Sequence, residues 1–176
     1  MKIKLQIKSR WTGSVLFEYD KENNTIKDTL IEAVKSGADL SGAYLRGADL
    51  RGAYLSGAYL RGAKEIPYLP IACPSDGAFI GWKKVKGCLV QLLIPEDAKR
   101  CSATTQKCRC EFAKVVSITR IDNGEELQSI KNTAYSPSVV YRVGEIVKPD
   151  SFDEDRWNEC SHGIHFFINK QDALNY

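Results

Sequence analysis

Apolar and polar side chains alternate in the first part of the chain. Residues 2–8 (KIKLQIK) place every second side chain on an apolar face, and SVLFEY repeats this pattern after the turn-forming pair Thr12-Gly13. A period of two is typical of a strand with one buried face. The two segments therefore predict a β-hairpin.

The next segment has a helical period. Apolar residues between 25 and 36 recur on one helix face, and Asn24 or Thr25 can cap its N-terminus. Asp28 stands three residues after Thr25, as in a variant of the capping box, and Gly37 supplies a left-handed stop. This pattern predicts one short amphipathic helix over 25–36.

From Ser36 to Lys64 the hydrophobic pattern has a period of five. Each pentad, such as ADLSG or AYLRG, carries one central leucine: Leu40, Leu45, Leu50, Leu55 and Leu60. A period of five fits neither a helix nor a strand. A chain with this period can close into a square coil if each pentad forms one side. Alanine and leucine would then lie inside, and the Asp, Tyr, Ser and Arg positions outside.

These pentads resemble the pentapeptide repeat family, whose pattern is A-(D/N)-L-x-x. The resemblance implies a right-handed quadrilateral β-helix with four pentads to a coil. The pentads here fill little more than one coil, and solenoids usually need about three units to be stable. We therefore expect caps at both ends, with the 25–36 helix at one and the chain after Lys64 at the other.

Prolines 67, 70 and 74 interrupt the pentad pattern and place a domain boundary near residue 64. The sequence beyond it predicts strands at 78–85, 87–94, 108–121, 139–147 and 164–168. Short helical segments are expected at 95–101, after Asp153 and after Asn169. The predicted fold class is α+β and mainly β. Its parts are an N-terminal hairpin and capping helix at 1–36, a pentapeptide-repeat coil at 37–64 and a small α+β domain at 65–176.

Composition and cysteine content suggest a compartment. The chain has 176 residues, of which 43% are hydrophobic and 27% charged, a balance typical of globular proteins. It contains no apolar run of about 18 residues, and its N-terminal segment does not resemble a signal peptide. We expect a cytoplasmic protein with no membrane partner, in which the six cysteines stay reduced.

Charge is unevenly distributed over the predicted C-terminal domain. Residues 64–114 hold 9 basic against 5 acidic side chains, and residues 115–176 hold 6 against 10. Within the basic half, 99–109 (KRCSATTQKCR) mixes cations with hydroxyls that suit phosphate oxygens, although it lacks the glycines of a P-loop. Trp82, beside three lysines in GWKKVKG, could stack on a base. Solvated loops and strand lysines explain both stretches nearly as well.

Both histidines lie in ECSHGIHFF. Cys160, His162 and His165 could join Cys108 and Cys110 in a zinc site, but one intervening residue gives poor ligand spacing, and we expect no bound metal. Cys160 could instead act as a nucleophile with either histidine, oriented by Asp155 or Glu159. The segment could also bind a ligand or simply pack into a core. The sequence alone does not decide between these roles.

A binding site is expected where basic charge approaches the histidines. The candidate ligand-binding residues are Lys107, Arg109, Cys160, His162, His165 and Trp82. Lys107 and Arg109 would converge there only if the strand at 164–168 is a neighbour of the strand at 108–121. We assign no catalytic residue and no cofactor.

The outer face of the repeats is a second candidate surface, for a protein partner. It comprises Tyr44, Arg46, Arg51, Tyr54, Tyr59 and Arg61. The tyrosines could equally form a structural stack. Some pentapeptide repeat proteins mimic DNA with a long acidic surface, but this coil is short and slightly basic. We expect neither DNA mimicry nor sequence-specific DNA binding. The acidic stretch from Asp150 to Glu159 could dock the basic half of another copy, which leaves a homo-oligomer open.

The order of segments, from SRWTGSVLFE through IPEDAKR to RWNECSHGIHFFI, resembles phage and prophage proteins whose C-terminal domain has no known function. This resemblance implies a phage accessory protein in the host cytoplasm. The favoured function is non-catalytic binding of a host protein or a phosphorylated small molecule, for example to antagonise a host defence. The alternative is a small enzyme that uses Cys160 with His162 or His165 on a nucleotide-like substrate.

Overall fold

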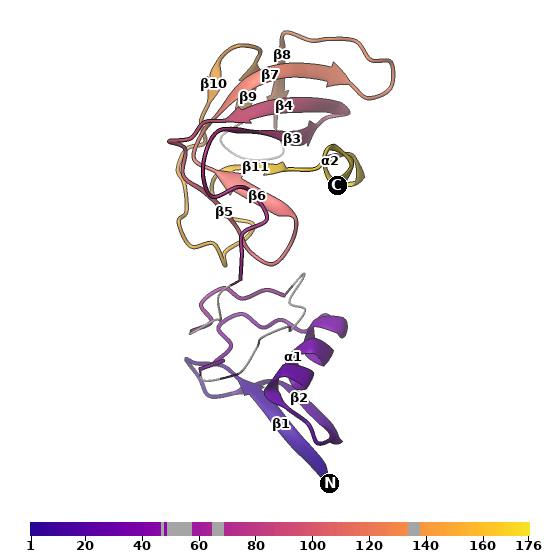
Figure 1. Cartoon of the computed structure of the whole chain (residues 1–176), viewed down its shortest axis with the longest axis vertical. Helices are drawn as coiled ribbons and strands as arrows, with labels where there is room; N and C mark the ends of the chain where they lie inside the picture. The colour runs from indigo at the N-terminus through magenta and orange to yellow at the C-terminus, as the bar shows by residue number, and fades with distance from the viewer. Residues whose placement is uncertain (47, 49–57, 65–68, 134–137) are drawn as a thin grey trace. The chain divides into compact units, whose positions relative to one another are not determined.

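A computed structural model describes residues 1–46, 48, 58–64, 69–133 and 138–176, and its described part is mainly β (Figure 1). Its elements are β1 (Lys2–Lys8), β2 (Val15–Glu22), α1 (Ile26–Lys35), β3 (Phe79–Val85), β4 (Cys88–Ile94), β5 (Arg100–Ser102), β6 (Lys107–Cys110), β7 (Ala113–Arg120), β8 (Ser129–Asn132), β9 (Val139–Arg142), β10 (Ile146–Val147), β11 (Ile164–Phe167) and α2 (Lys170–Asn175). No described helix is both long and apolar enough to cross a membrane.

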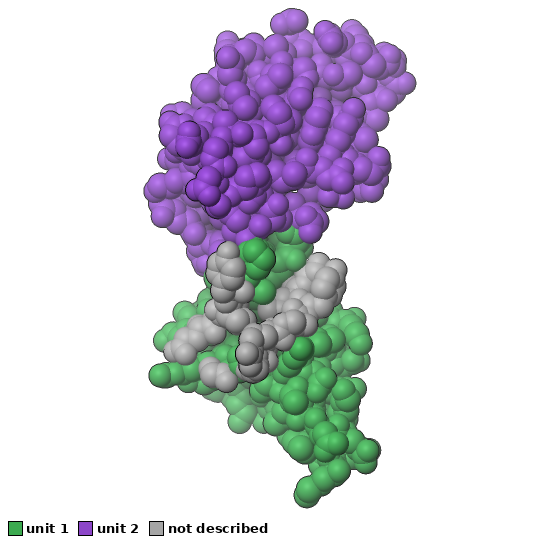
Figure 2. Space-filling model, viewed as in Figure 1, with its two compact units in different colours: residues 1–70, 103–105, 157–159 green, residues 71–102, 106–156, 160–176 purple. Residues whose placement is uncertain are grey.

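The chain forms two compact units, coloured separately in Figure 2. Unit 1 comprises residues 1–70, 103–105 and 157–159. Unit 2 comprises residues 71–102, 106–156 and 160–176. The division into three predicted domains stays a prediction, and each unit is described by itself below.

Unit 1 begins with the predicted hairpin and helix. Strands β1 and β2 pair antiparallel, and α1 follows directly. The Thr25 side chain accepts a hydrogen bond from the Asp28 amide, while the Asp28 carboxylate accepts one from the Thr25 amide, so the capping box is complete. Gly37 has φ +72° after the helix. The sequence pattern thus predicted both the start and the end of α1.

The described pentads bury their leucines. Leu40, Leu45 and Leu60 are at most 2% exposed, as the coil pattern predicts, whereas Leu50 and Leu55 lie outside the described residues. The amides of Ala43, Ala48 and Ala63 each bond the carbonyl of the leucine three positions earlier. Tyr44 forms a parallel β-bridge with Lys64, twenty residues later. The same turn therefore recurs in successive pentads.

The hairpin loop of unit 1 is attached to the repeats. The Arg10 amide donates to the Gly42 carbonyl, and the Tyr44 amide donates to the Lys8 carbonyl. The Trp11 ring lies so close to Gly42 that a Cβ there would come within 2.2 Å of it, and Gly62 touches the same ring. Because only glycine leaves space for this ring, the two glycines fix the loop against the pentads.

Unit 2 is built on a seven-stranded antiparallel sheet in the order β10-β7-β4-β3-β11-β6-β5. One apolar core lies against it, with the β8–β9 hairpin contributing Tyr141. Phe166 is fully buried in this core and packs against Gly81, where a Cβ would come within 2.6 Å of its ring. The strand nearest the C-terminus, β11, therefore lies inside the sheet, between β3 and β6.

The prediction of one continuous strand over 108–121 is wrong. The chain forms two strands there, because β6 pairs with β5 and β11 whereas β7 pairs with β4 and β10. Between them the Glu111 amide bonds the Lys99 carbonyl. Both strands bury apolar residues in the same core, so the hydrophobic pattern alone does not reveal the break.

Other differences lie in loops held by arginines. The helix predicted after Asp153 is absent from the described residues, because Asp153 caps a turn through the Asp155 amide and Arg109 binds both backbone carbonyls. The helical turn predicted at 95–101 starts as a turn, with the Ala98 amide bonded to the Pro95 carbonyl, but β5 begins at Arg100. Arg100 donates to the carbonyls of Pro95, Glu96 and Ala98. The strand predicted at 139–147 is divided at Gly144, which has φ +85°.

Candidate functional site

Strand β11 places one histidine beside a basic pocket. Phe167 of β11 lies opposite both Lys107 of β6 and Trp82 of β3, and His165 lies opposite Arg109. The required pairing of 164–168 with the start of the 108–121 segment is therefore confirmed. Pairing between β11 and β3 is limited to Trp82 and Phe167. The pocket lies next to this pair, where residues 83–86 follow Trp82.

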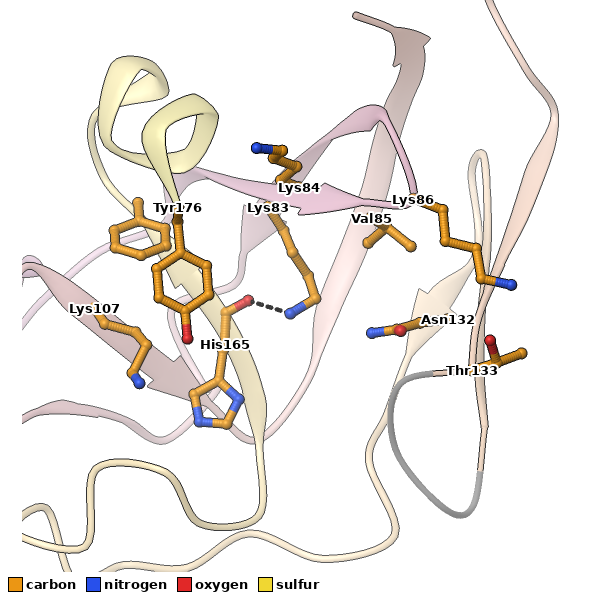
Figure 3. Close-up of a pocket in the computed structure, with 10 residues that line it drawn as sticks. Lys83, Lys84, Val85, Lys86, Lys107, Asn132, Thr133, His165 and Tyr176 are labelled. Atoms are coloured by element: carbon orange, nitrogen blue, oxygen red, sulfur yellow. Dashed lines mark hydrogen bonds between the residues drawn. The ribbon is translucent and has the colours of Figure 1, made fainter.

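The pocket has a volume of about 320 Å³ and lies entirely within unit 2 (Figure 3). Four lysines line it: Lys83, Lys84, Lys86 and Lys107. His165, Phe167 and Tyr176 form an aromatic side, and Asn132 and Thr133 supply uncharged polar groups. None of these described lining residues is acidic. Four ammonium groups without an acidic neighbour in the lining create a positive potential inside the hollow.

A tight turn at the end of β3 positions Lys83, Lys84 and Lys86. Val85 pairs with Cys88, so the β3–β4 hairpin has the two-residue loop Lys86-Gly87. Both loop residues have positive φ, 45° and 74°, as a type I′ turn requires. The turn ends β3 directly beside the pocket and presents Lys86 at its rim.

Lys83 and Lys107 are partly buried, whereas Lys84 and Lys86 are exposed. The Lys83 Nζ donates to the His165 carbonyl at 3.0 Å, and Figure 3 shows the side chain reaching across the pocket toward β11. Burial lowers the pKa of Lys83 to about 8, since an ammonium group loses hydration there. Its amine is therefore partly neutral near physiological pH.

Contacts with the C-terminal segment position the other side of the pocket. Lys84 Nζ donates to the Leu174 carbonyl at 2.9 Å, and Lys107 Nζ donates to Cys160 Sγ at 3.2 Å. Lys107 also lies over the Tyr176 ring, 5.6 Å from its centroid. Tyr176 in turn contacts Phe167, with ring centroids 5.2 Å apart. Lys107, Tyr176 and Phe167 thus contact one another in this order along one wall.

Two of the six predicted ligand residues line this pocket, namely Lys107 and His165. Arg109 instead is 2% exposed, and its guanidinium donates to the Asp153 and Asp155 carbonyls and lies over Phe152. Its aliphatic part packs on Gly163, where a Cβ would come within 2.3 Å. The geometry of Arg109 is that of a residue that holds the loop before β11.

The remaining predicted residues make other contacts. Cys160 is exposed and contacts Lys107, and His162 Nδ1 lies 3.0 Å from an Asp150 carboxylate oxygen. The His162 contact holds the pKa of Asp150 below its usual value. Trp82 is covered by Lys170, whose Nζ lies 5.3 Å from a ring centroid. These three residues do not line the described pocket.

The cysteines of unit 2 belong mostly to the core. Cys108 and Cys110 are fully buried, and burial raises the pKa of the Cys110 thiol, which therefore stays protonated. Among the described residues, no group of three or more His, Cys, Asp or Glu side chains is arranged to hold a metal ion. A hollow of about 430 Å³ near Lys99 and Glu154 carries both signs of charge. It has less preference for an anion than the lysine pocket.

Sequence reasoning missed Lys83, Lys84, Lys86 and Tyr176 as candidate ligand residues. The stretch GWKKVKG was noted for Trp82, but alternation in a strand placed its lysines on opposite faces. Lys83 nevertheless reaches the pocket, because β3 and β11 are unpaired there and its long side chain extends to the His165 carbonyl. The useful signal was the density of lysines next to a two-residue turn.

Comparison with known proteins gives two matches within the chain. Residues 36–64 match pentapeptide repeats, and residues 69–173, more than half of the chain, match the family of unknown function DUF5758. No curated protein and no solved structure matches the chain. The DUF5758 match covers β3 to β11 and nearly all the residues that line the lysine pocket. The chain therefore belongs to the family of unknown function DUF5758, with pentapeptide repeats preceding the family domain.

Proposed function

We propose that the DUF5758 domain of this protein binds a small phosphate-bearing molecule in the lysine pocket. The observation that carries this proposal is the lining itself, which includes four lysines and, among the described lining residues, no acidic side chain. Lysine ammonium groups are compact charges that bind phosphate oxygens well. A volume of about 320 Å³ suits a small ligand.

The aromatic wall favours a ligand with a flat ring. Phe167 and Tyr176 contact each other, and Lys107 lies over the tyrosine, so a planar group would find both stacking and charge on one side. A mononucleotide combines a ring with phosphate. Nucleoside monophosphates and diphosphates are therefore the first compounds to test.

Calorimetric titration of the full chain tests this proposal. Lys107→Ala and Lys84→Ala should each weaken binding of a nucleoside diphosphate at least about fivefold, because each removes a charge-assisted contact. Lys114→Ala removes the same charge from an exposed position on β7 outside the pocket and should bind as the unmodified protein does. Equal losses of affinity in all three variants would show that only the net charge of the protein matters, and would overturn the proposal.

The enzyme alternative predicts a different result. This alternative pairs Cys160 with His162 or His165. The described contact of Cys160 is with Lys107 and that of His162 is with Asp150, which favours binding over a Cys160–His162 pair. Cys160→Ser should therefore leave ligand affinity unchanged. Consumption of a nucleotide by the unmodified protein, lost in Cys160→Ser, would support the enzyme instead.

We also propose that the pentads close as a right-handed quadrilateral β-helix. The parallel bridge between Tyr44 and Lys64 spans twenty residues, or four pentads, and the repeated turns support one side per pentad. The full coil passes through positions outside the described residues. An experimental structure of the repeat segment would test the closure.

The biological setting forms part of the proposal. The resemblance to phage and prophage proteins supports an accessory role in the cytoplasm of a bacterial host, with antagonism of a defence that uses a phosphorylated signal. Tyr44, Arg46 and Arg61 are exposed and Tyr59 is half-buried on the described repeats, while Arg51 and Tyr54 lie outside the described residues. The outer face of the repeats is proposed as the contact for a host protein.

A further inference from the structure

The buried amine of Lys83 has a position that simple phosphate binding does not require. Lys83 is the first residue of the pocket-lining segment 83–86, and its side chain turns toward β11, where its Nζ donates to the His165 carbonyl at 3.0 Å. Lys84 and Lys86, its neighbours on the same hairpin, are exposed. Figure 3 shows the Lys83 nitrogen within the pocket, between the His165 side and the Asn132 side.

A carbonyl compound held in this pocket would meet a suitable nucleophile. Amines attack carbonyl carbon only in the neutral form, and lysines become nucleophilic when they are desolvated or lie near other cations. Lys83 has both features, because it is buried and shares the pocket with Lys84, Lys86 and Lys107. With a pKa of about 8, Lys83 is neutral at pH 7 far more often than an exposed lysine.

We propose that Lys83 forms an imine with a phosphate-bearing aldehyde or ketone whose phosphate is held by the other pocket lysines. The inference rests on the proposed function, because the phosphate brings the carbonyl group to the amine. The nitrogen lone pair forms a bond to the carbonyl carbon, and the carbonyl oxygen leaves as water with the two protons of the amine. The product is a carbon–nitrogen double bond, and no oxidant or reductant takes part.

The surrounding groups suit this step. The His165 carbonyl accepts one hydrogen from the amine and so orients the nitrogen, while the His165 imidazole points to the Lys107 side of the same pocket (Figure 3). The Cys110 thiol stays protonated and leaves the amine without an anionic partner from this cysteine. Lys83 thus differs from a phosphate-binding lysine at the pocket rim, because its amine is held by a backbone carbonyl inside the pocket.

Pyridoxal 5′-phosphate is a suitable probe because it carries an aldehyde and a phosphate. The full chain is treated with a substoichiometric amount, the imine is reduced with cyanoborohydride, and modified lysines are identified by peptide mass mapping. Label on Lys83 should exceed label on the exposed Lys114 by at least about tenfold. Lys83→Arg should lose this label, whereas Lys114→Arg should keep it. Label distributed according to exposure would overturn the inference.

Two related probes separate this inference from the proposed function. Pyridoxine 5′-phosphate has the phosphate without the aldehyde, and it should compete with labelling of Lys83. Pyridoxal has the aldehyde without the phosphate, and it should label Lys83 about tenfold less. Binding of pyridoxine 5′-phosphate with no Lys83 label would overturn the imine and leave the binding function. Equal labelling by both aldehydes would overturn phosphate recognition and leave a reactive lysine.

Discussion

At the scale of single residues, two glycines in unit 1 carry a packing role that composition does not reveal. Gly42 and Gly62 occupy equivalent pentad positions, and the Trp11 ring lies against both. Trp11 is 64% exposed, so its role is to cover backbone rather than to fill a core. The loop of the β1–β2 hairpin and two pentads therefore share one aromatic contact, beside their backbone hydrogen bonds.

Gly42→Ala should destabilise unit 1 more than Gly13→Ala does. Both glycines have φ near +70°, but a Cβ at Gly42 would come within 2.2 Å of the Trp11 ring, whereas nothing lies within 4 Å of one at Gly13. The left-handed backbone alone costs alanine about 1–2 kcal/mol. We expect the extra clash to add about 1–3 kcal/mol in chemical denaturation.

The double variant Trp11→Ala/Gly42→Ala serves as the control. If the ring causes the clash, adding Gly42→Ala to Trp11→Ala should cost no more than Gly13→Ala does. A cost of Gly42→Ala that stays the same with and without the Trp11 ring would contradict the packing explanation.

Lys83 gives a prediction about pH. Its pKa falls from 10.5 to about 8 on folding, so folding releases its proton between these values and the free energy of unfolding rises with pH across that window. Lys83→Met keeps the apolar stem without the charge. The variant should be more stable than the unmodified protein at pH 7, by up to roughly 3 kcal/mol.

Denaturation at pH 7 and pH 9.5 measures this effect. The advantage of Lys83→Met should shrink as pH rises, since the unmodified protein loses the cost of a buried charge. The titratable or charged groups facing Lys83 are Lys84, Lys86, Lys107, His165, Tyr176 and Cys110. These groups are present in both proteins. If the free energies of unfolding of the two proteins changed in parallel with pH, the pKa of Lys83 would not be lowered and the prediction would be wrong.

At the scale of elements, the pentads offer a direct comparison of inner and outer positions. Leu60 is 1% exposed and Tyr44 is 47% exposed on the same repeats. Leu60→Ala should lower the free energy of unfolding by about 2–5 kcal/mol because it empties a buried site. Tyr44→Ala should cost less than about 1 kcal/mol. Thermal and chemical denaturation would show both, and equal losses would contradict the assigned facing.

The elements also show what sequence patterns can predict. The helix 26–35 was predictable because Thr25, Asp28 and Gly37 give local signals for its start and its end. The division of 108–121 into β6 and β7 was not, because it depends on which distant strands pair with each half. Strand β5 was hidden for the same reason, since Arg100–Ser102 is defined by its pairing with β6.

At the scale of the whole molecule, the candidate site was predicted only in part. Lys107 and His165 were foreseen because basic and imidazole groups could meet if two strands paired, and they did. Arg109 was expected to point to the same ligand, but its guanidinium binds backbone carbonyls inside the fold. Alternation along a strand predicts a face, whereas long side chains choose their contacts from the tertiary structure.

Thiol reactivity should reflect the whole fold. Five of the six cysteines are buried and Cys160 is exposed. A colourimetric thiol reagent should therefore modify one thiol quickly in the native protein and six after denaturation. Cys160→Ser should remove the fast phase while the slow ones remain. Fewer than six thiols in denaturant, without reductant, would contradict the expectation that the cysteines stay reduced.

The position of β11 between β3 and β6 affects how the chain folds as it is synthesised. Its two neighbours in the sheet, β3 and β6, both precede it in sequence, and β11 comes after every other strand of the sheet. Until Ile164–Phe167 emerges from the ribosome, β3 and β6 each keep an unpaired edge and the Phe166 site in the core stays empty. Nascent chains of this protein therefore pass through a long interval in which exposed strand edges favour aggregation and chaperone binding.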